Sequence, residues 1–232
     1  MLKDYWKTIT NYDGELSTKS RSFVRNEIDL LPFRYSQGKW QSYNSSDKNL
    51  LTIAEYIRQV KPDVVLECGT FEARTTEYLA RVMRLGSSHL NRTLVTIDVP
   101  GCILHMDEDA ERVTFQEDEG WDEVIKIRNA RLSLLTRDQF VKVIYREGLT
   151  QVLLPELIRE FDFDFIYEDA SHLPNILIED FNHIDANAKK GCVVCFDDMK
   201  GNEFKDRVFA NVEDWEVFYT DLGRGQVWME KL

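Results

Sequence analysis

The sequence predicts an α/β fold: a Rossmann-like, seven-stranded, mainly parallel sheet with helices on both faces and a C-terminal antiparallel hairpin. Three observations support this prediction. Short apolar runs typical of buried strands alternate with segments whose apolar residues recur at helical spacing. Acidic residues stand at the C-terminal ends of these runs. The chain closes with two strand-like runs around a glycine-containing turn.

The expected parallel strands are short and apolar. VVLEC (64–68) suits a parallel strand that is buried on both faces. The same pattern recurs in RTLVTIDV (92–99), QFVKVIYREG (139–148), FDFIYEDASH (163–172) and GCVVCFDDM (191–199). WEVFYTDLGRGQVWMEK (215–231) is the expected closing hairpin.

Helical spacing marks the segments between these strands. Helices are expected over 45–60, after the turn that follows 64–68, and over 124–135, 149–161 and 173–191. Pro174 suits the first turn of the last helix and Gly191 its C-terminal end. The acidic stretch EDEGWDE (117–123) is expected to be a solvated loop.

The composition is that of a folded, acidic protein. With 232 residues, 43% of them hydrophobic, the chain can bury a substantial core. Its net charge of −12 argues against nucleic acid or an anionic membrane as a main partner, because both are negatively charged. The N-terminus does not have the pattern of a signal peptide, and no apolar run is long enough to span a bilayer, so a cytoplasmic protein is expected. We expect residues 1–45 to form an N-terminal lid or extension and residues 46–232 the main domain.

Two cysteines have the spacing of a redox or metal-binding pair. Cys192 and Cys195 lie in a strand-like run, however, and residues three apart on a strand point to opposite faces. We therefore expect two separate, reduced cysteines in the core.

Acidic residues end every expected parallel strand. In an open parallel sheet, ligands bind at the carboxyl ends of the strands, at the point where strand order reverses. The residues in question are Glu67, Asp98, Glu147, Glu168, Asp169, Asp197 and Asp198. The sequence therefore predicts one acidic edge of the sheet as the binding site.

The turn after the first expected strand contains a single glycine, Gly69. A dinucleotide pyrophosphate favours several glycines and less negative surroundings, so a nicotinamide dehydrogenase fits poorly. A ligand with positive charge and hydroxyl groups but no phosphate fits better, and S-adenosylmethionine is such a ligand. We expect Glu67 to face it as a negative group beside Gly69 and Thr70. Asp98 would accept hydrogen bonds from its ribose hydroxyls, and Glu147 would lie on the adenine side.

Two motifs carry a resemblance to a known family. VVLECGTFEARTTEYLA (64–80) resembles the first motif of class I S-adenosylmethionine-dependent methyltransferases. FDFIYEDASH followed by GCVVCFDDM resembles the metal-dependent small-molecule O-methyltransferases, the group with the catechol, caffeoyl-CoA and macrolide- or aminocoumarin-sugar enzymes. The resemblance runs from about Leu50 to the C-terminus. It departs from the usual pattern at Ala73, where a second glycine is common, and at Ser171.

Three aspartates form the second expected cluster. Neighbouring strands lie about 4.8 Å apart, so Asp169, Asp197 and Asp198 should converge. Converging carboxylates repel one another unless a cation lies between them, and oxygen ligands favour Mg²⁺, with Mn²⁺ or Ca²⁺ as alternatives. The resemblance implies the same metal site, with Asp169 also next to the cofactor. It also implies that His172, where the catechol enzymes have a lysine, takes a proton from the substrate; a helix-start or metal-ligand role for His172 stays open.

The resemblance implies metal-assisted transfer of a methyl group from S-adenosylmethionine to a hydroxyl of a small molecule. Two alternatives stay open at this point: a metal-independent methyltransferase, and a non-catalytic binding protein that keeps the fold. The acceptor cannot be read from the sequence, and a homodimer is one assembly that it allows.

Overall fold

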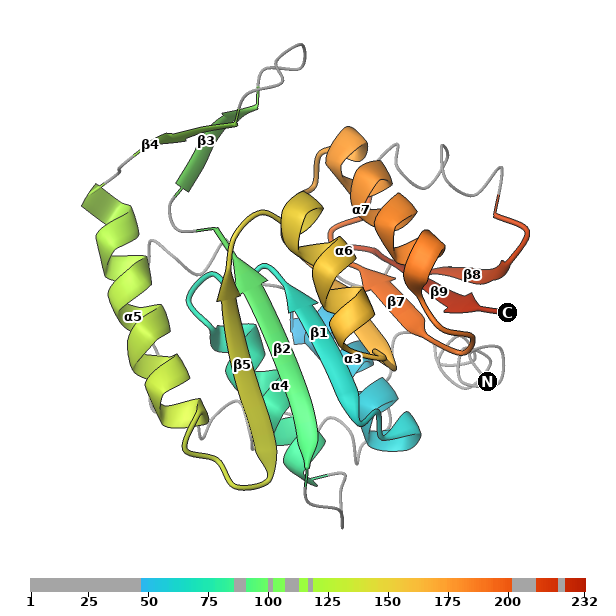
Figure 1. Cartoon of the computed structure of the whole chain (residues 1–232), viewed down its shortest axis with the longest axis horizontal. Helices are drawn as coiled ribbons and strands as arrows, with labels where there is room; N and C mark the ends of the chain where they lie inside the picture. Colours follow the sequence, from blue (N-terminus) through green and yellow to red (C-terminus); the bar gives the residue numbers. More distant parts are fainter. Residues whose placement is uncertain are drawn as a thin grey trace.

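Seven strands form one mixed sheet in the computed structural model, which describes residues 47–85, 91–99, 102–106, 113–116, 119–201, 212–220 and 224–232 (Figure 1). The strands are β1 (Val64–Cys68), β2 (Arg92–Asp98), β5 (Val141–Glu147), β6 (Phe165–Glu168), β7 (Val193–Phe196), β8 (Trp215–Thr220) and β9 (Gln226–Lys231). Their order is β5-β2-β1-β6-β7-β9-β8. The first five in this order are parallel, whereas β9 is antiparallel to both β7 and β8. The predicted fold class is confirmed.

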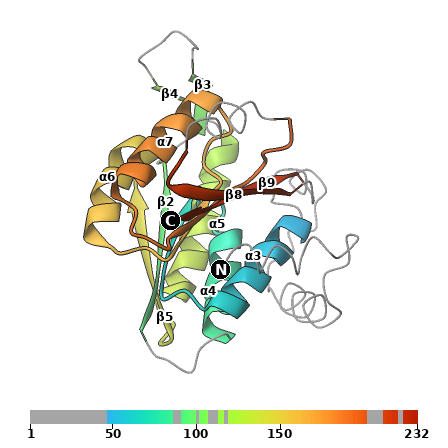
Figure 2. The same cartoon turned by 90° about the vertical axis from the view of Figure 1, so that its right-hand side faces the viewer.

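Helices cover both faces of this sheet (Figure 2). They are α3 (Asp47–Val60), α4 (Arg74–Leu85), α5 (Glu119–Leu135), α6 (Thr150–Glu160) and α7 (Pro174–Asn187). The first three lie on one face, and α6 and α7 lie on the other (Figures 1 and 2). The chain runs outward from β1 to β2 and β5, and then crosses back to β6 on the other side of β1. Strand order therefore reverses between β1 and β6, which is where a ligand site is expected in such a sheet.

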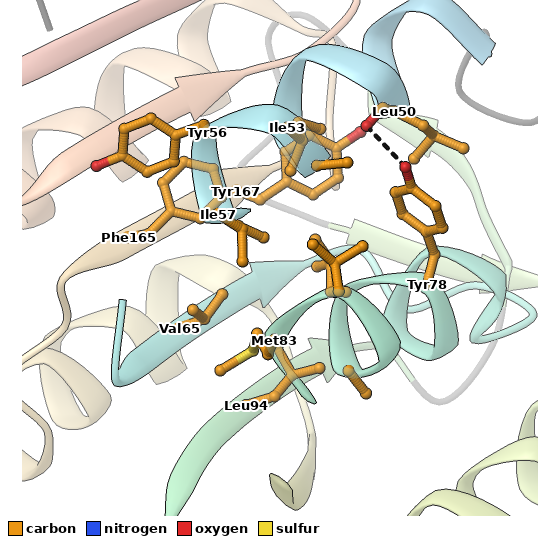
Figure 3. Close-up of a cluster of buried hydrophobic side chains, with 14 of the residues drawn as sticks. Leu50, Ile53, Tyr56, Ile57, Val65, Tyr78, Met83, Leu94, Phe165 and Tyr167 are labelled. Carbon is orange, nitrogen blue, oxygen red and sulfur yellow. Dashed lines mark hydrogen bonds between the residues drawn. The ribbon is translucent and has the colours of Figure 1, made fainter. Parts of the chain in front are cut away.

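The strands are buried on both faces because their side chains alternate between two apolar layers. Along β1, Val65 packs into the layer below α3 and α4, while Leu66 packs into the layer below α6 and α7. Figure 3 shows the first layer, where the Tyr78 hydroxyl donates a hydrogen bond to the Leu50 carbonyl at 3.2 Å. This bond satisfies a polar group inside an otherwise apolar cluster.

The two closely spaced cysteines behave as predicted. Cys192 belongs to the apolar layer below α6 and α7, and Cys195 to the opposite layer. Both are buried and free. They cannot form a redox pair or share a metal, because the sheet separates them.

The segment after β2 differs from the prediction. Strands β3 (Cys102–Met106) and β4 (Val113–Gln116) form a separate two-stranded hairpin, and α5 begins at Glu119. Most of the stretch 117–123, predicted to be a loop, is therefore the first turn of a helix. The indole of Trp121 in this first turn packs on the Phe71 ring, in the turn after β1, with 5.6 Å between the ring centroids. A second difference is that α7 ends at Asn187, so Gly191 lies in the following turn.

The predicted lid, residues 1–45, lies outside the described residues. Within the part of the chain that the structure describes, none of the helices has the length and apolar character needed to cross a membrane.

Two acids are buried below α6 and α7: Glu168, which was predicted to belong to the acidic binding edge, and Asp180, which the sequence analysis did not single out. Glu168 is 1% exposed and Asp180 is fully buried, and each has one carboxylate oxygen without a partner among the described residues. Asp180 accepts a hydrogen bond from the Thr150 hydroxyl at 2.9 Å. Burial raises the pKa of Asp180 to about 7, and burial together with Asp180 raises the pKa of Glu168 well above its usual value. The pair therefore holds protons in the folded protein that the unfolded chain releases.

The substitution Asp180→Asn should make the free energy of unfolding fall less as pH rises from about 4 to 7. A folded pKa above the unfolded one means that stability is fully present near pH 4 and falls by about 1.4 kcal/mol per unit as pH rises toward 7. Asparagine removes this loss and keeps an acceptor for Thr150. Urea unfolding at pH 5 and pH 8 measures the effect.

Asp185 on the same helix is the matched control. It pairs with Lys231 at 2.5 Å. Burial raises its pKa, but the hydrogen bonds from Lys231 and Trp215, together with the charge of Lys231, outweigh burial, so the pKa is lowered. Asp185→Asn should therefore lower stability at pH 8 and have less effect near pH 3. If both variants respond to pH alike, the assigned environments are wrong.

Candidate functional site

The site lies at the carboxyl ends of the parallel strands, where the turn between β1 and α4 meets the end of β6. Gly69 takes a φ of +97°, and a Cβ added there would stand 2.5 Å from the Asp169 carbonyl oxygen. The glycine is therefore required both for its backbone conformation and because two backbones approach each other at this point. The amides of Gly69 and Thr70 donate to the Ile97 carbonyl of β2 at 2.9 and 3.2 Å, which ties the turn to β2.

The turn also holds two non-glycine residues in the left-handed region. Phe71 has a φ of +45° and Ala73 a φ of +58°. Ala73 is fully buried and occupies the position where a second glycine is common in the resembling family. Its methyl group is accommodated, so this departure from the motif preserves the shape of the turn.

Glu67 lies beneath this turn and not at its surface. It is fully buried, and its Oε2 accepts hydrogen bonds from Thr76 at 2.5 Å and Thr96 at 2.6 Å. The Thr96 hydroxyl in turn contacts that of Thr70 at 2.6 Å. Oε1 is buried without a partner among the described residues.

Burial raises the pKa of Glu67 to about 8, although the two threonine hydroxyls oppose the effect. The carboxyl is therefore mainly protonated at pH 7. This differs from the expected negative group facing a cofactor. Glu67 instead links β1, β2 and α4, and so holds the turn in place.

Asp98 at the end of β2 already has several partners. Its Oδ2 accepts hydrogen bonds from the Phe71 amide at 2.6 Å and from Arg128 at 3.1 Å, and its Oδ1 accepts from the Val99 amide at 2.8 Å. Burial raises its pKa, while Arg128 opposes that shift. Oδ1 retains the capacity to accept from one ribose hydroxyl, whereas Oδ2 has two donors already.

Arg128 is a residue that the sequence analysis missed. It is 1% exposed, comes from α5, and lies over the Tyr145 ring at 5.2 Å. One turn further along, Arg131 donates to the Glu72 carbonyl at 2.9 Å. The sequence did offer a signal for it: two arginines three residues apart on an otherwise apolar face of the expected helix indicate buried side chains with specific partners. Together they fasten α5 to the turn after β1.

Glu147 stands beside Asp98 at the same edge of the sheet. The two residues are register partners on β5 and β2, and the Gly148 amide donates to the Asp98 carbonyl at 2.8 Å. The Glu147 side chain is exposed. A role on the adenine side stays a prediction.

The second cluster differs in one member from the predicted trio. Ligand atoms of Asp169, His172 and Asp198 lie within 4.8 Å of one another. Asp197 is outside this group and is fully buried. Its Oδ2 accepts a hydrogen bond from the Tyr167 hydroxyl at 2.5 Å, and its Oδ1 accepts from the Asn49 side chain.

The Tyr167 hydroxyl links the buried aspartate to the cluster. It lies 3.1 Å from Asp169 Oδ2 as well as 2.5 Å from Asp197 Oδ2. A phenol has one proton, so it donates to one of these carboxylates at a time. Tyr167 and Asn49 therefore position the two aspartates. Neither was expected from the sequence, because Asn49 is 148 residues away from its partner.

Asp198 has two cationic or potentially cationic neighbours. His172 Nε2 lies 3.4 Å and Arg224 2.6 Å from the same oxygen, Oδ2. Burial and the nearby Asp197 raise the pKa of Asp198 to about 6, and Arg224 opposes them. Burial lowers the pKa of His172, so its imidazole is neutral at pH 7 and can accept a proton.

These residues fit a divalent cation. Two carboxylates and an imidazole are a donor set that Mg²⁺ or Mn²⁺ accepts. Asp198 Oδ1 is buried and has no partner in the described part of the chain, which leaves one acceptor unsatisfied at the centre of the cluster. The positive charge of Arg224, paired with Asp198, opposes a metal there.

Comparison with known proteins identifies the fold. No protein-family profile matches the chain, and no curated protein matches it in sequence. Among solved structures, the methyltransferase PaMTH1 of Podospora anserina with SAH bound has a TM-score of 0.61 at 13% identity, over 100% of this chain and 95% of that one. The O-methyltransferase of Bacillus cereus in complex with SAH has a TM-score of 0.56 at 16% identity, covering 94% and 92%. TomG of Streptomyces achromogenes, an O-methyltransferase of tomaymycin synthesis in complex with SAM, has a TM-score of 0.57 at 16% identity, covering 97% and 94%. The chain thus has the fold of class I S-adenosylmethionine-dependent methyltransferases.

The substitution Gly69→Ala should destabilise the protein far more than Gly191→Ala. Both glycines have a positive φ, but a Cβ at Gly191 would meet nothing within 4 Å. Gly191→Ala should therefore cost about 1–2 kcal/mol for its backbone conformation alone. Gly69→Ala adds a clash with the Asp169 backbone and should cost at least about 3 kcal/mol. Urea unfolding of the two variants tests this, and similar losses would show that the two backbones can separate.

The substitution Glu67→Gln separates a structural from a cofactor-binding role. Glutamine keeps an acceptor for Thr76 and Thr96 but cannot ionise, so it should be at least as stable as glutamate at pH 8, where the folded glutamate loses stability. If Glu67 only supports the turn, the affinity for S-adenosylmethionine measured by calorimetry should change less than about threefold. Removing one member of a charge pair with the cofactor would weaken binding much more.

Thr76→Val is the matched control for this experiment. It removes one donor to Glu67 and should cost about 1–3 kcal/mol, because a buried acceptor loses a partner. A loss of cofactor affinity above tenfold in Glu67→Gln, with unchanged stability, would instead support the charge role predicted from the sequence.

Proposed function

We propose that this chain transfers the methyl group of S-adenosylmethionine to a hydroxyl oxygen of a small molecule, with a divalent cation held by Asp169 and Asp198 beside His172. One observation carries the proposal. The Gly69 turn packs on the Asp169 backbone, and the Asp169 carboxyl belongs to the second cluster. A cofactor on the turn and an acceptor at the cluster would therefore be neighbours, as in-line transfer requires.

The turn and the ends of β2 and β5 would hold the cofactor. Gly69 and Thr70 shape the turn, Asp98 offers Oδ1 to the ribose, and Glu147 stands beside it. The methyl group would be supplied by the sulfonium of the cofactor. Solved structures that share this fold have SAH or SAM bound, which supports S-adenosylmethionine as the cofactor.

The acidic cluster would bind and orient the acceptor. A divalent cation supplies charge that lowers the pKa of a coordinated hydroxyl. Asp169 and Asp198 provide its oxygen ligands. His172 is half-exposed and neutral, so its Nε2 can either complete the ligand set or take the proton of the hydroxyl. We favour proton transfer, because its exposure leaves the ring accessible to a substrate.

A metal-independent methyltransferase is the second candidate. The ion pair between Arg224 and Asp198 favours it, because the guanidinium already places a positive charge at the cluster. In that case the guanidinium would orient the acceptor oxygen, and the aspartates would hold the guanidinium.

His172→Gln should lower kcat about 100-fold and leave the affinity for S-adenosylmethionine unchanged, because loss of a general base slows proton transfer only. The measurement is methyl transfer from labelled S-adenosylmethionine to a panel of catechols and sugar alcohols, together with calorimetry of the cofactor. His183→Gln is the matched control, since His183 lies on α7 away from the cluster, and it should behave as wild type.

Three results would change the proposal. Absence of cofactor binding to the wild type would overturn methyl transfer altogether. Full activity in EDTA would remove the metal and leave the metal-independent reaction. Equal losses in the two histidine variants would remove His172 as the base.

A further inference from the structure

Arg224 is fixed beside the acidic cluster by its backbone. It follows β8 in the turn that leads to β9. Its amide donates to the Asn49 side chain at 3.3 Å, and its carbonyl accepts from the Lys200 amide at 2.9 Å. The next residue, Gly225, is so close to this loop that a Cβ would stand 2.8 Å from the Lys200 nitrogen. The arginine is thus held against the segment that carries Asp198.

The side chain of Arg224 points back to Asp198. Its NH1 lies 2.6 Å from Oδ2, the oxygen that also faces His172 Nε2 at 3.4 Å. The side chain is 35% exposed, and its Nε is buried with no partner among the residues that the structure describes. The contact is an ion pair made through NH1. An arginine held in this way can leave Asp198 without dismantling the turn.

A divalent cation and this guanidinium cannot share Asp198 without cost. Two positive charges a few ångströms apart repel strongly in a partly buried site. A cation bound by Asp169 and Asp198 would therefore have to displace Arg224 toward solvent.

We propose that Arg224 is a built-in competitor of the metal: it occupies Asp198 when no metal is bound and thereby weakens the affinity of the cluster for divalent cations. This inference rests on the proposed metal site. It adds a regulatory contact from the β8–β9 turn, since anything that draws Arg224 away, such as an anionic group on an acceptor, would strengthen metal binding.

The test is calorimetry with Mn²⁺ alone on the full chain. Arg224→Gln should bind Mn²⁺ at least about tenfold more tightly than wild type, because one competing charge is gone. Arg224→Lys keeps the charge and should stay close to wild type. Arg146→Gln is the control for loss of an arginine, since Arg146 forms an exposed pair with Glu160 at 3.8 Å, and it should not change the affinity.

The outcomes separate this inference from the proposed function. Equal Mn²⁺ affinities in wild type and Arg224→Gln, with binding lost in Asp198→Asn, would overturn the competition and keep the metal site. No binding in either protein would overturn both. Tighter binding in Arg224→Lys as well as Arg224→Gln would show that geometry, and not charge, is responsible. Thermal unfolding of each variant verifies that it is folded.

Discussion

The approach of Gly69 to the backbone of Asp169 is the contact on which the site depends. It joins the turn after β1 to the end of β6, the two neighbours between which strand order reverses. A side chain at Gly69 would push these ends apart. The turn that we propose holds the cofactor would then separate from the acidic cluster, although the rest of the sheet stayed the same. Gly69 therefore determines how close the turn after β1 lies to the acidic cluster, as well as the shape of the turn itself.

The acids at this edge of the sheet have different partners and different degrees of burial. These differences separate acids that hold the framework from acids that can contact a ligand. Glu67 is buried, depends on threonine hydroxyls and is mainly protonated at neutral pH. Asp197 is buried against Tyr167 and Asn49. Asp98 and Asp198 are less deeply buried and each faces an arginine. Acids of the first kind hold the framework, since removing their buried hydrogen-bond partners would cost stability. Acids of the second kind retain capacity to meet a ligand.

The sequence predicted the strands and the acidic edge because those depend on local pattern. An apolar run such as 64–68 can be recognised by itself, and parallel strands bring their ends together whatever their side chains are. The partners of the acids could not be predicted in this way. Asn49 and Asp197 meet across 148 positions, and Arg224 reaches Asp198 only because β9 folds back against β7. The hairpin β3–β4 was missed because its acidic surroundings resembled a loop.

The contacts of Ala73 and Ser171 show what the two departures from the family motif do to the structure. Ala73 adopts the left-handed conformation that a glycine would take, and its methyl group is buried without displacing the turn. Ser171 accepts a hydrogen bond from the Leu173 amide at 3.3 Å and so prepares the start of α7. Neither change removes geometry that methyl transfer would need, so neither favours a non-catalytic protein. The guanidinium at Asp198 bears on the chemistry more directly, because it is a charge at the point where the acceptor oxygen would bind. Whether the reaction uses a metal therefore depends more on the β8–β9 turn than on the motif at β1.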